Sequence, residues 1–270
     1  MRSPDTANNR LRIPALLVIN LFISCTIVKE NRDSCPCNLV IEITGVRDTP
    51  ATLLVQPLRD SACAEILSFS RDTLLTMFVP RGGVSLSAWT TTASGSAVLI
   101  PYGSEAPPLY FYHGVVDAAG EVAYADITLR KQFCTVSLEV EGPPGWGPPI
   151  GTAVRGAVSG MSLTGGILPG DFKCSPSGLA AGPDSDAGGA VSIGSIRIPR
   201  QHPDSQLMLD IVMEDNVLRT FSLGSYLQKA GYDWTAPDLA DITVHMDLSV
   251  SEITFSYPGL CKPISLTVDI

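Results

Sequence analysis

The sequence predicts an all-β protein that folds as two tandem β-sandwiches after an N-terminal signal peptide. Short runs of alternating apolar and polar residues recur along the chain, and Gly, Pro, Ser and Asp separate them. No stretch of about ten residues carries the apolar stripe of an amphipathic helix. Hydrophobic residues make up 45% of the chain and charged residues 17%, which is typical of an ordered protein.

Residues 1–24 have the pattern of a signal peptide. Arg2, Arg10 and Arg12 form a positively charged start, and an apolar run covers Ile13–Ser24. A helix of about 12 residues spans about 18 Å, which is too short for a hydrocarbon core of about 30 Å. The run therefore indicates export and not a membrane-spanning helix.

Cys25 follows this run directly, after the small residue Ser24. This pattern resembles a bacterial lipobox, in which the cysteine becomes the first residue and carries acyl chains such as palmitate. Stable membrane anchoring needs more than one such chain. We expect lipidation at Cys25, followed by a polar tether that ends at residue 37; an ordinary cleaved signal with an incidental Cys25 is the alternative.

The first predicted sandwich covers residues 38–130. It contains about seven strands by the alternation rule. The runs that predict them are Leu39–Thr44, Thr52–Gln56, Ser68–Val79, Val84–Trp89, Leu109–His113 and Val122–Leu129.

The second predicted sandwich covers residues 131–270. Its alternating runs begin near Phe133, and Val154–Leu163 predicts one or two strands. Ser225–Ala230 with Gly231 behind it predicts a short helix. Gly165–Gly189 is rich in Gly, Pro, Ser and Asp, so it predicts a long loop. The remaining predicted strands are Val191–Ile198, Leu207–Met213, Val217–Leu223, Ile242–Leu248, Ile253–Tyr257 and Ile264–Ile270.

Six cysteines lie beyond Cys25, and in an exported protein they are candidates for disulfides. They are Cys35, Cys37, Cys63, Cys134, Cys174 and Cys261. Cys35 and Cys37 are too close to bridge comfortably, and one of them could pair with Cys63. Because their spacing does not match a zinc motif, we expect no metal site.

The sequence lacks the motifs of common enzymes. It contains no His-Glu-x-x-His, no Gly-x-Ser-x-Gly and no phosphate-binding glycine loop before a helix. His113, His202 and His245 are interpreted as structural residues, and we expect neither catalysis nor a cofactor. The net charge of −9 and the absence of a basic cluster argue against nucleic-acid binding.

Two weaker candidates for ligand binding remain. Asp184 and Asp186 are spaced as in calcium loops, but Gly188 and Ser195 stand where an EF-hand needs ligands, so a turn is favoured. Among the tryptophans, Trp146 lies in a Pro-rich loop and is the candidate for sugar binding. Trp89 and Trp234 are expected in the two cores.

Three segments, taken in their order along the chain, resemble the FimB/Mfa-type fimbrial anchor subunits of the Bacteroidia fimbrillin superfamily. The first is the signal ending in Cys25 with the tether and Asn31–Cys37. The second is Leu129–Phe133 with the strand after it. The third is Trp234–Asp247, in which Asp241 and Ile242 open an alternating strand. The chain departs from the family pattern at Lys262–Pro263, where a Trp often follows.

The resemblance implies two transthyretin-like sandwiches and a lipid-anchored subunit of the outer membrane. Such a subunit would hold a fimbrium at the cell surface through β-strand exchange with a shaft or accessory subunit. The alternatives are a tip or accessory adhesin of the same superfamily and a glycan-binding surface lipoprotein.

Overall fold

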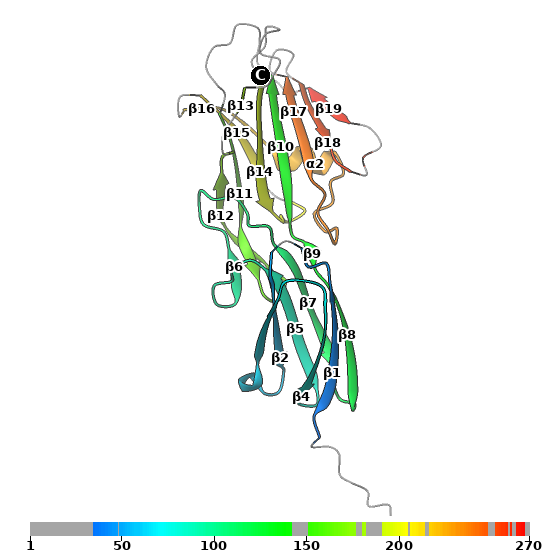
Figure 1. The fold of residues 1–270 in the computed structure, drawn as a ribbon. Helices are drawn as coiled ribbons and strands as arrows, with labels where there is room; N and C mark the ends of the chain where they lie inside the picture. Colours follow the sequence, from blue (N-terminus) through cyan, green and yellow to red (C-terminus); the bar gives the residue numbers. More distant parts are fainter. Residues whose placement is uncertain are drawn as a thin grey trace, which may run out of the picture. The chain divides into compact units, whose positions relative to one another are not determined.

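The computed structural model confirms an all-β protein (Figure 1). It describes residues 35–47, 49–141, 151–176, 180–181, 191–204, 206–213, 216–247, 252–258, 260 and 263–267. Residues Pro36–Ile270 form one compact unit. The predicted division into domains at residue 130 therefore stays a prediction.

The first sandwich packs a three-stranded sheet against a five-stranded one. The order is β4-β1-β8 in the smaller sheet and β3-β2-β5-β7-β9 in the larger. The smaller sheet contains β1 (Cys37–Thr44), β4 (Thr73–Val79) and β8 (Val122–Thr128). The larger contains β2 (Ala51–Pro57), β3 (Glu65–Phe69), β5 (Gly83–Thr90), β7 (Tyr110–Asp117) and β9 (Arg130–Lys131), with a 3-10 turn at Ser61–Cys63 between β2 and β3.

Alternation in β1 explains its place at the centre of the smaller sheet. Leu39, Ile41 and Ile43 point into the core and are at most 1% exposed, while the residues between them face outward. β1 pairs antiparallel with β4 and parallel with β8. The three apolar side chains join a cluster with Leu53 and Leu86 from the opposite sheet. Burial of this face fixes the register of β1, because a slip by one residue would turn its apolar side chains toward solvent.

The second sandwich repeats this plan with more strands. Its sheets have the orders β13-β14-β10-β17-β18-β19 and β12-β11-β15-β16, and the short helix α2 (Leu223–Lys229) packs on the core between them. The strands of the first of these sheets are β10 (Phe133–Glu141), β13 (Ala180–Ala181), β14 (Val191–Pro199), β17 (Ile242–Asp247), β18 (Glu252–Ser256) and β19 (Ile264–Thr267). The strands of the second are β11 (Gly151–Ser162), β12 (Ile167–Cys174), β15 (Met208–Met213) and β16 (Asn216–Phe221).

Strand pairing shows that the two sandwiches share one topology. Each begins with a central strand, β1 or β10, that pairs antiparallel with one neighbour and parallel with the other. In each second sheet, the next strand of the chain has two neighbours: β2 lies between β3 and β5, and β11 lies between β12 and β15. The predicted pair of sandwiches is thus a pair of similar units.

A short strand, β6 (Ala97–Leu99), links the two sandwiches. It lies between β5 and β7 in the sequence, yet it pairs with β11 of the second sandwich. Trp89 and Phe111 of the first sandwich share a small apolar cluster with Met161 and Leu163 of the second. β6 was not predicted.

One predicted loop is wrong in part. Ile167–Cys174, within the predicted loop Gly165–Gly189, forms β12 and pairs with β11 across register shifts near Pro169. β12 is the last strand of its sheet, and an edge strand tolerates Pro and Gly because one side of its backbone pairs with no neighbour. The predicted run Val154–Leu163 falls in one long strand, β11, which covers Gly151–Ser162, and α2 confirms the predicted short helix.

Candidate interaction site

The outer face of the β4-β1-β8 sheet carries exposed apolar side chains. Leu74 and Phe78 on β4 are 67% and 70% exposed, and Val122 and Tyr124 on β8 are 47% and 75% exposed. Half-buried Val40 lies between them on β1, opposite Tyr124. We call these five residues the apolar face. A set of large apolar side chains on one sheet face is typical of a contact surface.

Asn38 is a polar residue at one end of the apolar face. It lies opposite Phe78 on one side and opposite Val122 on the other. Its Oδ1 atom is covered from solvent but accepts no hydrogen bond within the described part of the chain. Such an atom lacks the usual partner of a buried acceptor, so a donor from a bound partner would stabilise it.

β8 is also an open edge for backbone hydrogen bonding. Among the described strands it pairs only with β1. Asn38 donates to the carbonyl of Glu121, and Leu129 donates to the carbonyl of Thr44. Since bonds in a parallel pair involve alternate residues, the backbone groups of Tyr124 and Asp126 point away from β1. They are available to an added strand.

The pattern of β4 contained a signal for this face. The run Thr73–Val79 has Leu at both 74 and 75 and apolar residues at 77, 78 and 79, so both faces of the strand are apolar. A strand with one solvated face usually alternates instead. The departure from alternation was the available clue, and it was missed.

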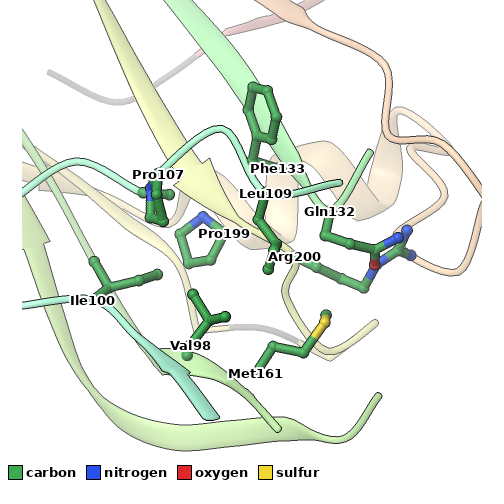
Figure 2. A pocket seen from close by; sticks show the side chains of 11 residues that line it. Val98, Ile100, Pro107, Leu109, Gln132, Phe133, Met161, Pro199 and Arg200 are labelled. Atoms are coloured by element: carbon green, nitrogen blue, oxygen red, sulfur yellow. The ribbon is translucent and has the colours of Figure 1, made fainter. Parts of the chain in front are cut away.

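A small pocket lies where the β6 segment meets the second sandwich (Figure 2). Its volume is about 20 Å³, which suits a single water molecule and no larger ligand. Arg200 at its wall donates to Gln132 Oε1 at 2.7 Å and to the carbonyls of Trp234 and Ala236. Burial lowers the pKa of Arg200 from its ordinary value. The guanidinium therefore serves to hold the chain around Trp234.

The structure brings Ser87 and His113 together, with Ser87 Oγ 3.0 Å from His113 Nδ1. Ser87 is 3% exposed, and its hydroxyl donates to the carbonyl of Leu163 at 2.7 Å. A hydroxyl has only one proton, so His113 must donate from Nδ1 to Ser87. The pair lacks the arrangement of a nucleophile and its base, in which serine donates to histidine.

The other two histidines lie apart from this pair. His202 is exposed in a turn. His245 on β17 lies 3.5 Å from Glu139 on the outer face of its sheet. No group of three or more His, Cys, Asp or Glu side chains in the described ranges could hold a metal ion.

Four cysteines occur as thiols: Cys37, Cys63, Cys134 and Cys174. Burial raises the pKa of Cys37 and Cys174, and it raises that of Cys134 to about 12. At Cys63 the hydrogen bond to Asp60 raises the pKa. Thiols with raised pKa values are weak nucleophiles at neutral pH. Cys35 is exposed and Cys261 lies outside the described residues, so a disulfide that involves either stays a prediction.

Two of the segments that resembled a family touch each other. Asp238 accepts from the backbone of Lys131 at 2.8 Å and pairs with Arg130 at 2.9 Å. Asp241 accepts from Lys131 Nζ and from the backbone of Thr135, both at 2.6 Å. Burial opposes ionisation, but these donors bring the pKa of both carboxyls below the ordinary value. This cluster, the aspartate clamp, fastens β9 and the start of β10 to the segment before β17.

Several candidate residues lie outside the described residues: Cys25, Trp146, Asp184, Asp186 and Cys261. Trp89 and Trp234 are 6% and 3% exposed, which confirms their predicted burial. Within the described ranges, no helix has the length and apolar character that crossing a membrane requires.

Comparisons with known proteins identify the fold. No protein-family model and no curated protein matches the chain. Among solved structures, the fimbrial anchor protein Mfa2 from Porphyromonas gingivalis superposes with a TM-score of 0.59 at 9% identity, over 83% of this chain and 98% of that one. A proposed polysaccharide-binding protein from Bacteroides thetaiotaomicron gives 0.58 at 12% identity, over 86% and 98%. A proposed adhesin from the same species gives 0.57 at 12% identity, over 87% and 99%. The chain therefore shares the two-sandwich fold of these bacterial proteins.

Proposed function

We propose that this protein is a fimbrial subunit of the bacterial surface that anchors a fimbrium to the outer membrane. Lipid on Cys25 holds it in the membrane, and the first sandwich binds a shaft or accessory subunit. The proposal is supported by the fold shared with Mfa2 over 83% of this chain and 98% of that one. It assigns the protein a binding role and no catalytic one.

The observation that carries the proposal is the position of the apolar face. Asn38, Phe78 and Val122 form the row nearest the start of β1, and β1 begins at Cys37, where the predicted tether ends. A subunit bound on this face would therefore contact the residues that directly follow the tether.

The open edge of β8 favours strand addition as the means of binding. β1 occupies the centre of its sheet, so that position is filled. A strand from a fimbrial subunit would pair with β8, and its side chains would pack beside Val122 and Tyr124. Main-chain hydrogen bonds then supply affinity, and the apolar side chains set the register.

Replacement of the proposed lipidation site tests the anchoring role. The variant Cys25→Ala is compared with wild type and with Cys63→Ala, which removes an exposed thiol elsewhere. Cells are labelled with a clickable palmitate analogue, and membrane and medium are fractionated. We expect Cys25→Ala alone to lose the label, leave the membrane and release fimbriae. Fimbriae still held by membrane-bound Cys25→Ala protein would refute the proposal.

A second candidate is a tip or accessory adhesin, which the fold shared with a proposed adhesin favours. The two roles differ in position on the fibre. Immunogold labelling of isolated fimbriae should find an anchor at the cell-proximal end and a tip adhesin at the distal end. Absence of the palmitate label from the wild-type protein would also favour the adhesin.

A further inference from the structure

A second hollow lies on the outer face of the β12-β11-β15-β16 sheet, away from the apolar face. Its volume is about 300 Å³, within the range of small-ligand sites. Its lining is rich in polar side chains, unlike the pocket of Figure 2. The residues that line it are Tyr102, Arg155, Gly156, Ala157, Asp171, Phe172, Lys173 and Gln206.

Two cationic side chains face each other in this hollow. Arg155 on β11 and Lys173 on β12 are directly opposite in an antiparallel pair, so their side chains share the outer face. Like charges in this arrangement destabilise a sheet. Lys173 forms no ion pair with any residue in the described part of the chain. Arg155 already pairs with Asp210, so an anion bound in the hollow would supply the missing partner of Lys173.

Asp210 orients the guanidinium of Arg155. Its carboxylate accepts from Arg155 Nε at 2.8 Å and from the hydroxyl of Thr220 at 2.6 Å, and the residue is 3% exposed. Only the Nε edge of Arg155 is used in this contact, and the side chain remains 49% exposed. The terminal nitrogens keep their donors for a ligand, and the geometry suits the two oxygens of a carboxylate.

Tyr102 lies at the rim of the hollow on a tight turn. Ser104 donates to the carbonyl of Pro101 at 3.0 Å, and Gly103 has φ +85°, a conformation that favours glycine at this turn position. The backbone of Gly103 also donates to the carbonyl of Lys173 at 2.9 Å. This bond holds the turn against β12, with Tyr102 69% exposed.

We propose that this hollow binds an acidic saccharide, a sugar that carries a carboxylate. Arg155 and Lys173 bind the carboxylate, and Asp171 and Gln206 accept hydrogen bonds from ring hydroxyls. The ring of Tyr102 packs on the apolar face of the sugar, since an aromatic side chain offers a broad apolar surface with a polar tip. An acidic peptide fits less well, because it offers few hydroxyl donors to Asp171 and Gln206. The site is separate from the fimbrial contact and does not depend on it.

Titration calorimetry of the mature full-length protein tests this site. The probe is tetragalacturonate, and the comparison ligand is the same tetramer with its carboxyls reduced to alcohols. We expect the acidic tetramer to bind at least about tenfold more tightly, because one hydrogen bond to a charged group contributes about tenfold in affinity. Binding should weaken with added salt.

Variants assign the binding to named side chains. Lys173→Gln should weaken binding about tenfold, whereas Lys229→Gln, a matched change on α2, should not. Tyr102→Ala should weaken it about tenfold, and Tyr102→Phe, which keeps the ring, should stay within about threefold.

Four results would overturn the proposal. They are no binding of the acidic tetramer, equal binding of the reduced tetramer, full binding by Lys173→Gln, and equally tight binding of hexaglutamate. None of these results bears on the palmitate and fibre experiments, so the two proposals fail separately.

Discussion

The two sandwiches have the same strand topology but different outer faces. In the β4-β1-β8 sheet the outer face carries Leu74, Phe78 and Tyr124, all more than 60% exposed. On the second sandwich the outward side chains of the central strand and its parallel neighbour are polar, with Ser137 and Glu139 on β10 and Thr243 and His245 on β17.

Their sheet edges differ as well. β17 pairs with β18, which in turn pairs with β19, whereas β8, the counterpart of β17, is the last strand of its sheet. The inner faces are equally apolar, because both sandwiches must bury a core. The repeat thus preserves what folding needs, while among the described residues the exposed apolar face lies beside β8, an edge strand whose counterpart β17 is interior.

Proline substitutions in β8 and in its counterpart β17 should give the largest difference in stability between the two sandwiches. His245→Pro removes a ladder N–H from the interior strand β17, so we expect a loss of unfolding free energy of at least about 2 kcal/mol. Asp126→Pro removes an N–H that points away from β1, so the loss should stay below about 1 kcal/mol. Urea denaturation of both variants measures this.

The same pair separates stability from binding. If a partner strand adds to β8, Asp126→Pro should abolish capture of purified fimbriae while the protein stays folded. Ala125→Pro is the control within β8: its N–H points to β1, so it should destabilise as His245→Pro does. Full capture by Asp126→Pro would argue against strand addition at this edge.

Polar substitution of the apolar face should give an intermediate effect. Phe78→Ser with Tyr124→Ser removes two exposed rings, so stability should change by no more than about 1 kcal/mol. Capture of fimbriae should fall at least about tenfold, because aromatic side chains contribute strongly at interfaces. Thr243→Ser with Thr254→Ser on the second sandwich is the control. Surface plasmon resonance that showed equal losses for both double variants would remove the distinction between the faces.

Acid should have the smallest effect, and it should act where β9 and the start of β10 contact the segment before β17. The folded-state pKa of Asp238 and Asp241 lies below its ordinary value, and the unfolded value is about 3.9. The aspartate clamp therefore stabilises the fold above about pH 4 and loses this contribution as the pH falls through the folded-state pKa. The gain is small because the two side chains are 49% and 55% exposed.

Thermal unfolding measured from pH 7 to pH 3 tests this dependence. Asp241→Asn keeps an acceptor for the backbone of Thr135 but removes the charge beside Lys131. The variant should be slightly less stable at pH 7 and should lose less stability in acid. An identical pH profile for variant and wild type would show that the clamp contributes nothing.

Much of the fold could be predicted from local patterns. Strands such as β1, β8 and β17 alternate cleanly, because one face of each is buried and the other is not. The short helix could be predicted because Gly231 follows it and favours a helix end. Trp89 and Trp234 were predicted to lie in the cores because each is at or near a predicted strand, and both are buried.

Other parts could not be predicted because their causes are not local. β6 has three residues and forms only because β11 lies beside it. β12 contains Pro169 and Gly170, which predict a loop until the strand's place at a sheet edge is known. The lining of the hollow proposed to bind a saccharide joins residues from the Tyr102 turn, two strands and the segment before β15.

The sequence by itself determined the class of fold, because the alternation of buried and exposed side chains belongs to each strand and can be recognised one strand at a time. Only the tertiary structure decided which strand ends a sheet, which thiols are buried and which outward side chains gather on one face. These properties depend on pairing between segments far apart in the chain, as when Phe78, Asn38 and Val122 meet in one row.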